Sequence, residues 1–95
     1  MPVFEKNCPN SNQIRAARWL LGWGQNEAVK CTNTSLSSLR RYEGLKPDQN
    51  PYDHLRPSII ERIVDGFKNA GIEFLNSEDS LGVTLRTSSE LSKKS

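Results

Sequence analysis

The stretch QNEAVKCTNTSLSSLRRYEG, residues 25–44, decides how this chain is expected to fold. Each half of it reads as one short helix, over residues 25–31 and 36–43, and Asn33 lies between them. Asparagine is among the few residues besides glycine that readily adopt a positive φ, so a tight turn is expected there. Ser35 is a strong N-cap for the second helix. The stretch therefore predicts two short helices joined by a tight turn.

Two further helices and a β-hairpin are expected around this unit. Apolar residues recur at helical spacing in residues 14–21 and again in residues 60–67, and Pro57 suits the first turn of the later helix. From residue 72 onward the pattern alternates with a period of two, so residues 72–75 and 82–86 are expected to pair as strands. The predicted fold class is mainly α, a bundle of four to five helices with a C-terminal β-hairpin.

The chain is expected to divide into four segments. Residues 1–10 read as an irregular N-terminal arm, residues 11–71 as a helical domain, residues 72–86 as the hairpin, and residues 87–95 as a polar, disordered tail. The loop over residues 45–57 holds three prolines and is long for a compact domain, so a short turn is expected within it.

The charge distribution favours a polyanionic partner. The formal net charge is only +2, but residues 1–46 hold seven Lys/Arg against three Asp/Glu, a net of +4, and residues 47–95 hold six against eight, a net of −2. A domain with one basic side suits nucleic acid. The mean hydropathy is −0.65, and no apolar run has the length of a membrane helix or a signal peptide, so a soluble, cytoplasmic protein is expected.

The residues that metals and catalysis require are scarce. Cys8 and Cys31 lie 23 positions apart without a CxxC pair, and His54 is the single histidine, so neither a metal nor another cofactor is expected. Cys31 is expected to be a small buried side chain and Cys8 an incidental thiol, with no disulfide between them. The sequence shows no nucleophile–histidine arrangement, paired carboxylates or phosphate-binding glycine loop. We therefore expect no enzyme activity and no small-molecule substrate.

The stretch 25–44 resembles the helix-turn-helix of the Cro/CI-like (XRE) family of transcription regulators. In that family a glutamine opens the first helix of the motif, and a small residue in that helix packs against the recognition helix that follows. A glycine usually makes the turn between them. A Ser or Thr caps the recognition helix, and apolar and aromatic residues followed by Glu end it. The corresponding positions here are Gln25, Val29 with Ala28 beside it, Asn33, Ser35, Leu39, Tyr42 and Glu43. The flanking strings IRAARWLLGWGQNE and AGIEFLNSEDSLGVTLR are also similar to segments of these regulators.

The resemblance implies a lambda-repressor-like bundle whose residues 11–71 form a DNA-binding domain. It also implies a repressor-type regulator that binds double-stranded DNA sequence-specifically at a palindromic operator, as a homodimer associated with the nucleoid. A second possibility is an antitoxin or a mobile-element control protein, because such proteins use the same domain. A third possibility is an adaptor that binds a protein partner through a helix-turn-helix fold, although Arg40 and Arg41 would make its recognition face basic.

The second helix of the motif would enter the major groove with its N-terminal residues at the base edges. Leu36 can contact a thymine methyl group, and Ser37 can donate or accept a hydrogen bond. Arg41 can donate two hydrogen bonds to one guanine. Arg40 lies at the flank of this face. The alternatives are solvated arginines and a Leu36 that packs against a neighbouring helix. The expected DNA-contacting set is Gln25, Thr34, Ser35, Leu36, Ser37, Arg40 and Arg41, with Gln25 and Thr34 at phosphates.

Two structural expectations accompany this interface. The resemblance pairs Arg18 in the first helix with Glu43 at the end of the recognition helix, the alternative being two independent surface charges. A two-stranded hairpin is marginal by itself, so Ile72, Phe74, Val83 and Leu85 need cover. The helix over residues 57–71 could supply it, or the four residues could form the dimer interface.

Overall fold

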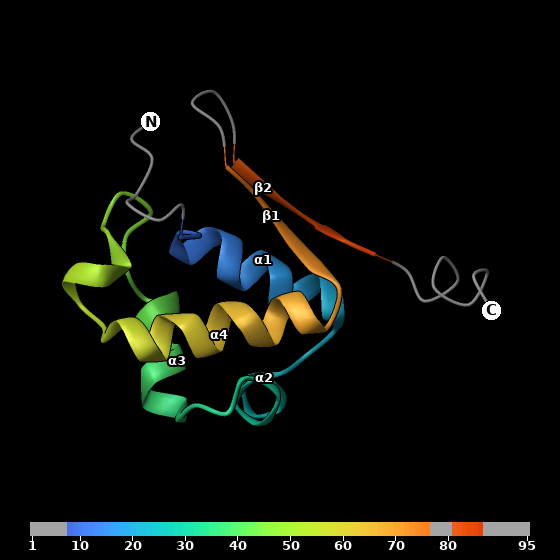
Figure 1. The fold of residues 1–95 in the computed structure, drawn as a ribbon, viewed down its shortest axis with the longest axis horizontal. Coiled ribbons are helices and arrows are strands. Elements are labelled where there is room, and N and C mark those ends of the chain that lie inside the picture. Colours follow the sequence, from blue (N-terminus) through green and yellow to red (C-terminus); the bar gives the residue numbers. More distant parts are fainter. Residues whose placement is uncertain (1–7, 77–80, 87–95) are drawn as a thin grey trace.

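The computed structural model describes residues 8–76 and 81–86, and the helices dominate this part of the chain (Figure 1). The predicted mainly helical fold with a C-terminal hairpin is confirmed. Residues 1–7 of the arm expected over residues 1–10, and the disordered tail expected over residues 87–95, lie outside the described residues. In chain order the elements are α1 (Ser11–Leu21), α2 (Gln25–Thr32), α3 (Leu36–Glu43), a 3-10 turn (Pro51–Asp53), α4 (Pro57–Asn69), β1 (Ile72–Asn76) and β2 (Leu81–Leu85).

Local capping interactions set the ends of α1. The Asn10 side chain accepts a hydrogen bond from the Gln13 backbone N–H over 2.9 Å, and the Gln13 side chain accepts one from the Asn10 backbone N–H over 2.9 Å. This reciprocal capping box satisfies backbone donors that the first turn leaves free. Gly22 ends the helix in the left-handed region at φ 72°. The helix includes residues 14–21, the range over which helical spacing was predicted.

The turn between α2 and α3 also has the predicted geometry. Asn33 has φ 58° and ψ 47°, and it is the only non-glycine residue with a positive φ in the part of the chain that the structure describes. The Ser35 hydroxyl accepts a hydrogen bond from the Ser38 N–H over 3.2 Å and so caps α3. The turn and cap together determine the direction in which α3 leaves α2.

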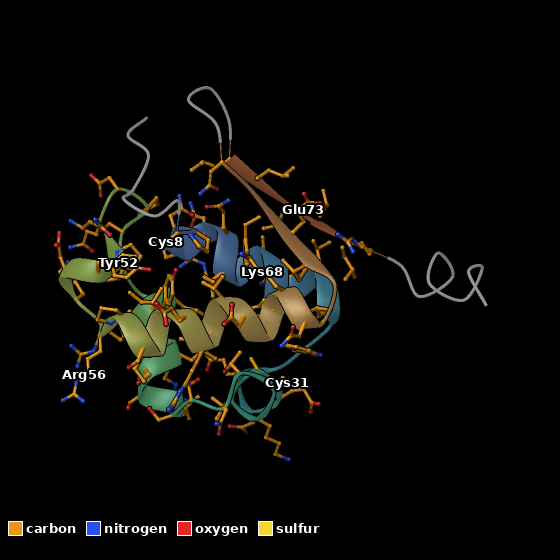
Figure 2. All side chains as sticks on the ribbon, viewed as in Figure 1. Cys8, Cys31, Tyr52, Arg56, Lys68 and Glu73 are labelled. Carbon is orange, nitrogen blue, oxygen red and sulfur yellow. The ribbon has the colours of Figure 1, made fainter. Side chains whose placement is uncertain are left out.

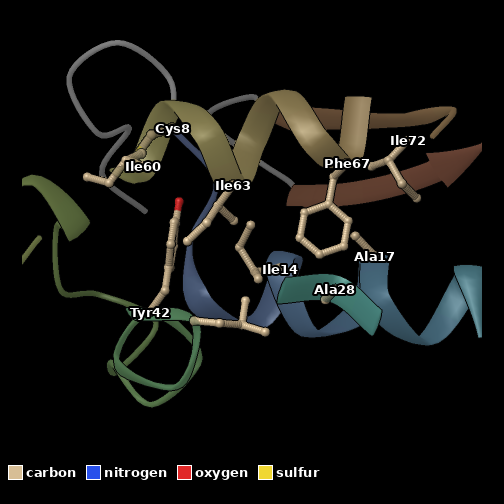
Figure 3. Packing of buried hydrophobic residues seen from close by; sticks show 10 residues of the cluster. Cys8, Ile14, Ala17, Ala28, Tyr42, Ile60, Ile63, Phe67 and Ile72 are labelled. Atoms are coloured by element: carbon tan, nitrogen blue, oxygen red, sulfur yellow. The ribbon is translucent and has the colours of Figure 1, made fainter. Parts of the chain in front are cut away.

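The core lies between α4 on one side and the first three helices on the other. Figure 3 shows the Phe67 ring pointing from α4 toward Ala17 on α1 and Ala28 on α2, all three fully buried. The Trp23 ring stacks on Phe67 with a centroid distance of 5.5 Å, and Phe74 of β1 meets it edge-on at 6.4 Å. The buried hydrophobic residues are Cys8, Ile14, Ala17, Ala28, Leu39, Tyr42, Ile60, Ile63, Phe67 and Ile72.

The hairpin packs against its own chain. Its strands are antiparallel, with Ile72 opposite Leu85 and Phe74 opposite Val83. Ile72 is only 4% exposed, and the other three residues are partly buried against the same core. The protein's own core therefore buries Ile72 and partly covers the other three residues expected at a dimer interface, and Ile72 has almost no surface left for a second subunit.

The predicted environments of the two cysteines are wrong, because Cys8 and not Cys31 is the buried one. Cys8 is 5% exposed and belongs to the core, whereas Cys31 is exposed on α2. Figure 2 shows them at opposite sides of the molecule. Cys31 falls on the outer face of a short helix, while Cys8 precedes α1 in a segment that tertiary packing buries.

Two absences concern only residues 8–76 and 81–86. No group of three or more His, Cys, Asp or Glu side chains is arranged to hold a metal ion among them. None of the helices in this part combines the length and apolar character that crossing a bilayer requires.

Candidate nucleic-acid interface

Helix α3 has one buried side and one open side. Leu39 and Tyr42 are fully buried, three positions apart, as expected for the inward face of a helix. Ser37, Arg40 and Arg41 are exposed on the rest of its surface. The open side is polar and basic, and its apolar residue is the half-buried Leu36.

The N-terminal end of α3 is lined with hydroxyl groups. The Ser35 hydroxyl lies 2.9 Å from the Ser38 hydroxyl and 3.3 Å from the Ser37 hydroxyl. The Thr34 hydroxyl lies 2.8 Å from that of Thr32, so Thr34 is tied to the end of α2. Short hydroxyl side chains allow another surface to approach the first turn closely and can donate or accept hydrogen bonds there.

A buried ion pair fixes the opposite end of α3 to α1. The Arg18 Nε atom lies 2.7 Å from Glu43 Oε2, and its Nη2 atom lies 3.1 Å from Oε1. The two side chains are 16% and 6% exposed, so the contact is bidentate and largely shielded from water. Arg18 Nη1 also donates to the Trp23 carbonyl over 3.2 Å. The residues expected to pair thus lie together, and each polar end of the pair has a partner.

Two further contacts that the sequence reading missed hold the same end of α3. Arg15 donates to the Glu43 backbone carbonyl and to the Asn12 side chain. The buried Tyr42 hydroxyl donates to the Pro9 carbonyl over 2.7 Å. The signal for Arg15 is its position three residues before Arg18, on a neighbouring face of α1. The Tyr42 contact has no sequence signal, because Pro9 lies 33 positions away.

Burial perturbs the ionisable groups beneath α3. Desolvation raises the pKa of the Cys8 thiol from its ordinary 9.0 to about 11, although a hydrogen bond with Tyr42 opposes the shift. Desolvation also raises the pKa of the Tyr42 hydroxyl, and the nearby Cys8 raises it further. Both groups are neutral near pH 7 even at their ordinary pKa values, and burial moves their ionisation to still higher pH. The support of α3 on this side therefore combines the uncharged Tyr42 contact with the charged contacts that Arg15 and Arg18 make to Glu43.

Gln25 is engaged within the protein. Its Nε2 atom donates to Glu43 Oε1 over 3.1 Å, and its Oε1 atom accepts from Arg40 Nε over 3.4 Å. The sequence reading placed this side chain at a DNA phosphate, whereas the structure uses both of its polar ends in protein contacts. Spacing along the chain could not reveal this, because Glu43 is 18 positions away.

One more cation belongs to this part of the surface. Arg56 is exposed and is the N-cap residue of α4. Figure 2 shows it at the N-terminal end of α4, the end of the molecule at which α3 also lies. Sequence reasoning missed it, because a loop arginine carries no periodic signal.

Comparison with known proteins adds no assignment: no protein-family model and no curated protein matches this chain. The geometry of α3 and its supports is therefore the basis for the function proposed below.

Proposed function

We propose that this protein binds double-stranded DNA sequence-specifically as a transcription regulator with a lambda-repressor-like helix-turn-helix domain. The observation that carries the proposal is the two-sided character of α3. Its open side is polar and basic, and its other side is held by the bidentate Arg18–Glu43 pair. A rigidly mounted helix with such a face suits insertion into a major groove.

The proposed contacts follow from which α3 side chains are exposed. Arg41 lies one turn beyond Ser37 on the same exposed side, so both can meet base edges. A guanidinium matches the O6 and N7 atoms of guanine, which makes Arg41 the residue proposed to read a base. Arg40 lies to the side of this face and is proposed to bind a phosphate. The half-buried Leu36 retains enough surface to contact a thymine methyl group.

We further propose that two copies bind a palindromic operator, as such regulators read two half-sites about one helical turn apart. The core face of the hairpin is not the surface proposed for this pairing, because its own helices cover it. Binding-site selection from random duplexes at near-physiological salt tests both parts. A recovered palindrome supports paired copies, a single short site supports binding by one copy, and recovery of no motif argues against sequence-specific binding.

Two arginine variants then distinguish base reading from charge. Arg41→Ala should cost about 1–3 kcal/mol of binding free energy on the selected site and relax the preference at one base position. Arg40→Ala should weaken binding to every duplex alike and reduce the salt dependence by about one charge. If Arg41→Ala weakens selected and random duplexes equally, Arg41 binds a phosphate. If neither variant loses affinity, α3 is not the DNA-binding element.

A protein-binding adaptor is the second candidate, and one observation favours it. Trp19 is 76% exposed and Leu20 is 47% exposed, at consecutive positions of α1. Exposed large apolar residues are frequent at protein interfaces. Under this alternative the wild-type protein would show only weak, salt-sensitive DNA binding without a preferred sequence.

A further inference from the structure

The Gln25 side chain connects the buried ion pair with the open surface of α3. On one side it donates to Glu43 over 3.1 Å, and on the other it accepts from Arg40 over 3.4 Å. Arg18 holds the same Glu43 carboxylate from α1. The contacts therefore connect the largely buried Arg18 with Arg40 at the surface, through Glu43 and Gln25.

The chemistry of Glu43 decides which way the Gln25 amide points. An ionised carboxylate accepts hydrogen bonds and donates none, so only the Nε2 end of the amide can face it. The Oε1 end then faces away from Glu43, where it can only accept, and a guanidinium can only donate. Glu43 thus orients the amide, and the amide presents one acceptor to Arg40.

We infer that Gln25 is a positioning residue for Arg40 and not a direct ligand of DNA. Both ends of its side chain make contacts within the protein, and Glu43 fixes the direction in which the amide points. One of the two Nε2 hydrogens remains for another partner, so the tests below compare the positioning role with a direct phosphate contact. The contact occupies Arg40 Nε and leaves the two terminal nitrogens of the guanidinium available. A side chain that is restrained beforehand loses less conformational freedom when it binds. The positioning is a property of the protein alone, and its effect on affinity rests on the proposed DNA binding.

Arg41 provides an internal comparison. It is exposed on the same helix and directly follows Arg40. Within residues 8–76 and 81–86 its side chain makes no hydrogen bond or ion pair. The two arginines therefore share a helix and a solvent environment and differ in whether Gln25 restrains them.

The first test measures the arginine side chains in the full chain without DNA. The 1H–15N heteronuclear NOE of the Arg40 Nε group should exceed that of Arg41 in the wild type. In Gln25→Met, which keeps the length of the side chain and removes its polar atoms, the Arg40 value should fall to that of Arg41. Asn26→Ala, an exposed position on the same helix, is the matched control and should change neither value. Equal wild-type values, or an Arg40 value that Gln25→Met leaves unchanged, would refute the positioning role.

The second test uses the salt dependence of binding to a duplex that carries the selected site. Glutamine is uncharged, so losing a direct Gln25–phosphate contact would lower affinity and leave the salt slope unchanged. If Gln25 acts through Arg40, Gln25→Met should reduce the slope by up to about 0.9, the contribution of one phosphate contact. Affinity should fall about two- to tenfold, the range for one neutral hydrogen bond. In an Arg40→Ala background, Gln25→Met should cause no further loss.

The outcomes separate this inference from the proposed function. An unchanged slope with additive losses for Gln25→Met and Arg40→Ala would make Gln25 a direct DNA ligand and overturn the inference. A wild-type protein that binds no duplex would refute the proposed function. The NOE comparison between Arg40 and Arg41 would then decide the positioning role without DNA.

Discussion

Replacing Gly66 with alanine should destabilise the protein, although alanine is the better helix former. Gly66 is buried in α4, where that helix crosses the end of α2. A Cβ atom at this position would lie 2.7 Å from Thr32 Cγ2, 2.8 Å from Thr32 Cα and 3.0 Å from the Cys31 carbonyl oxygen. Two of these three atoms belong to the backbone of α2, so a change of side-chain rotamer cannot relieve the overlap.

The size of the effect follows from two opposing terms. In a helix interior, exchanging glycine for alanine stabilises by about 1 kcal/mol. Forcing extra volume into a packed interior costs about 1–3 kcal/mol. Carbon atoms normally pack at about 3.5–4.0 Å, so α2 must move by roughly 1 Å and the upper end of the cost applies. The expected net loss of unfolding free energy is about 2 kcal/mol, or about 10 °C in the melting temperature of a domain of this size.

Urea unfolding followed by circular dichroism measures this loss, with Asp65→Ala as the matched control. Asp65 precedes Gly66 on α4 and is exposed, so its replacement should change stability by less than about 0.5 kcal/mol. Thr32→Ser removes the Cγ2 atom, which is only one of the three contacts. In the Gly66→Ala background it should therefore restore only part of the loss. A Gly66→Ala protein as stable as the wild type, or more stable, would refute the close approach of α2 and α4.

Variants at three other positions test the supports of α3 and of the hairpin. Glu43→Ala should cost about 2–3 kcal/mol of unfolding free energy, which is below the cost for a fully buried pair because Arg18 keeps some exposure. Glu43→Gln should cost less than Glu43→Ala. A loss below about 0.5 kcal/mol in Glu43→Ala would contradict a structural role for the pair. Gln13→Met should speed hydrogen exchange in both strands, because Gln13 Nε2 donates to the backbone carbonyls of each; unchanged protection would argue against this attachment. Burial raises the pKa of Cys8 to about 11, so the unfolded chain ionises first and the unfolding free energy should fall between about pH 9 and 11. Cys8→Ala should remove that part of the fall and leave the part due to the raised pKa of Tyr42; parallel pH profiles for the two proteins would exclude the contribution of Cys8.

The helices and their ends were predictable because neighbouring residues determine them. The capping side chain of Ser35 reaches a backbone N–H only three residues on, and Asn33 adopts a positive φ through its own conformational preference. The range predicted for the second helix of the motif, residues 36–43, agrees with α3. The inward positions Leu39 and Tyr42 follow from helical periodicity alone.

The candidate site was only partly predictable, since its key contacts join distant positions. The Arg18–Glu43 pair came from a family resemblance and not from spacing, because 25 positions separate the two residues. The use of Gln25 within the protein depends on where the Glu43 carboxylate lies after folding. The exposure of Arg40 and Arg41 was expected from periodicity, but only packing distinguishes the restrained arginine from its neighbour.

The sequence by itself determined the order and the approximate limits of the helices, the turn at Asn33 and the alternating pattern of the hairpin. These features depend on backbone preferences and hydrogen bonds that span three or four residues. Tertiary structure alone decided which cysteine is buried, why Gly66 must lack a side chain, and what covers the hairpin. The hairpin is also attached through Gln13, whose amide donates to the Gly82 carbonyl 69 positions away. Such contacts depend on how helices approach one another, and that arrangement depends on the packing of the whole core.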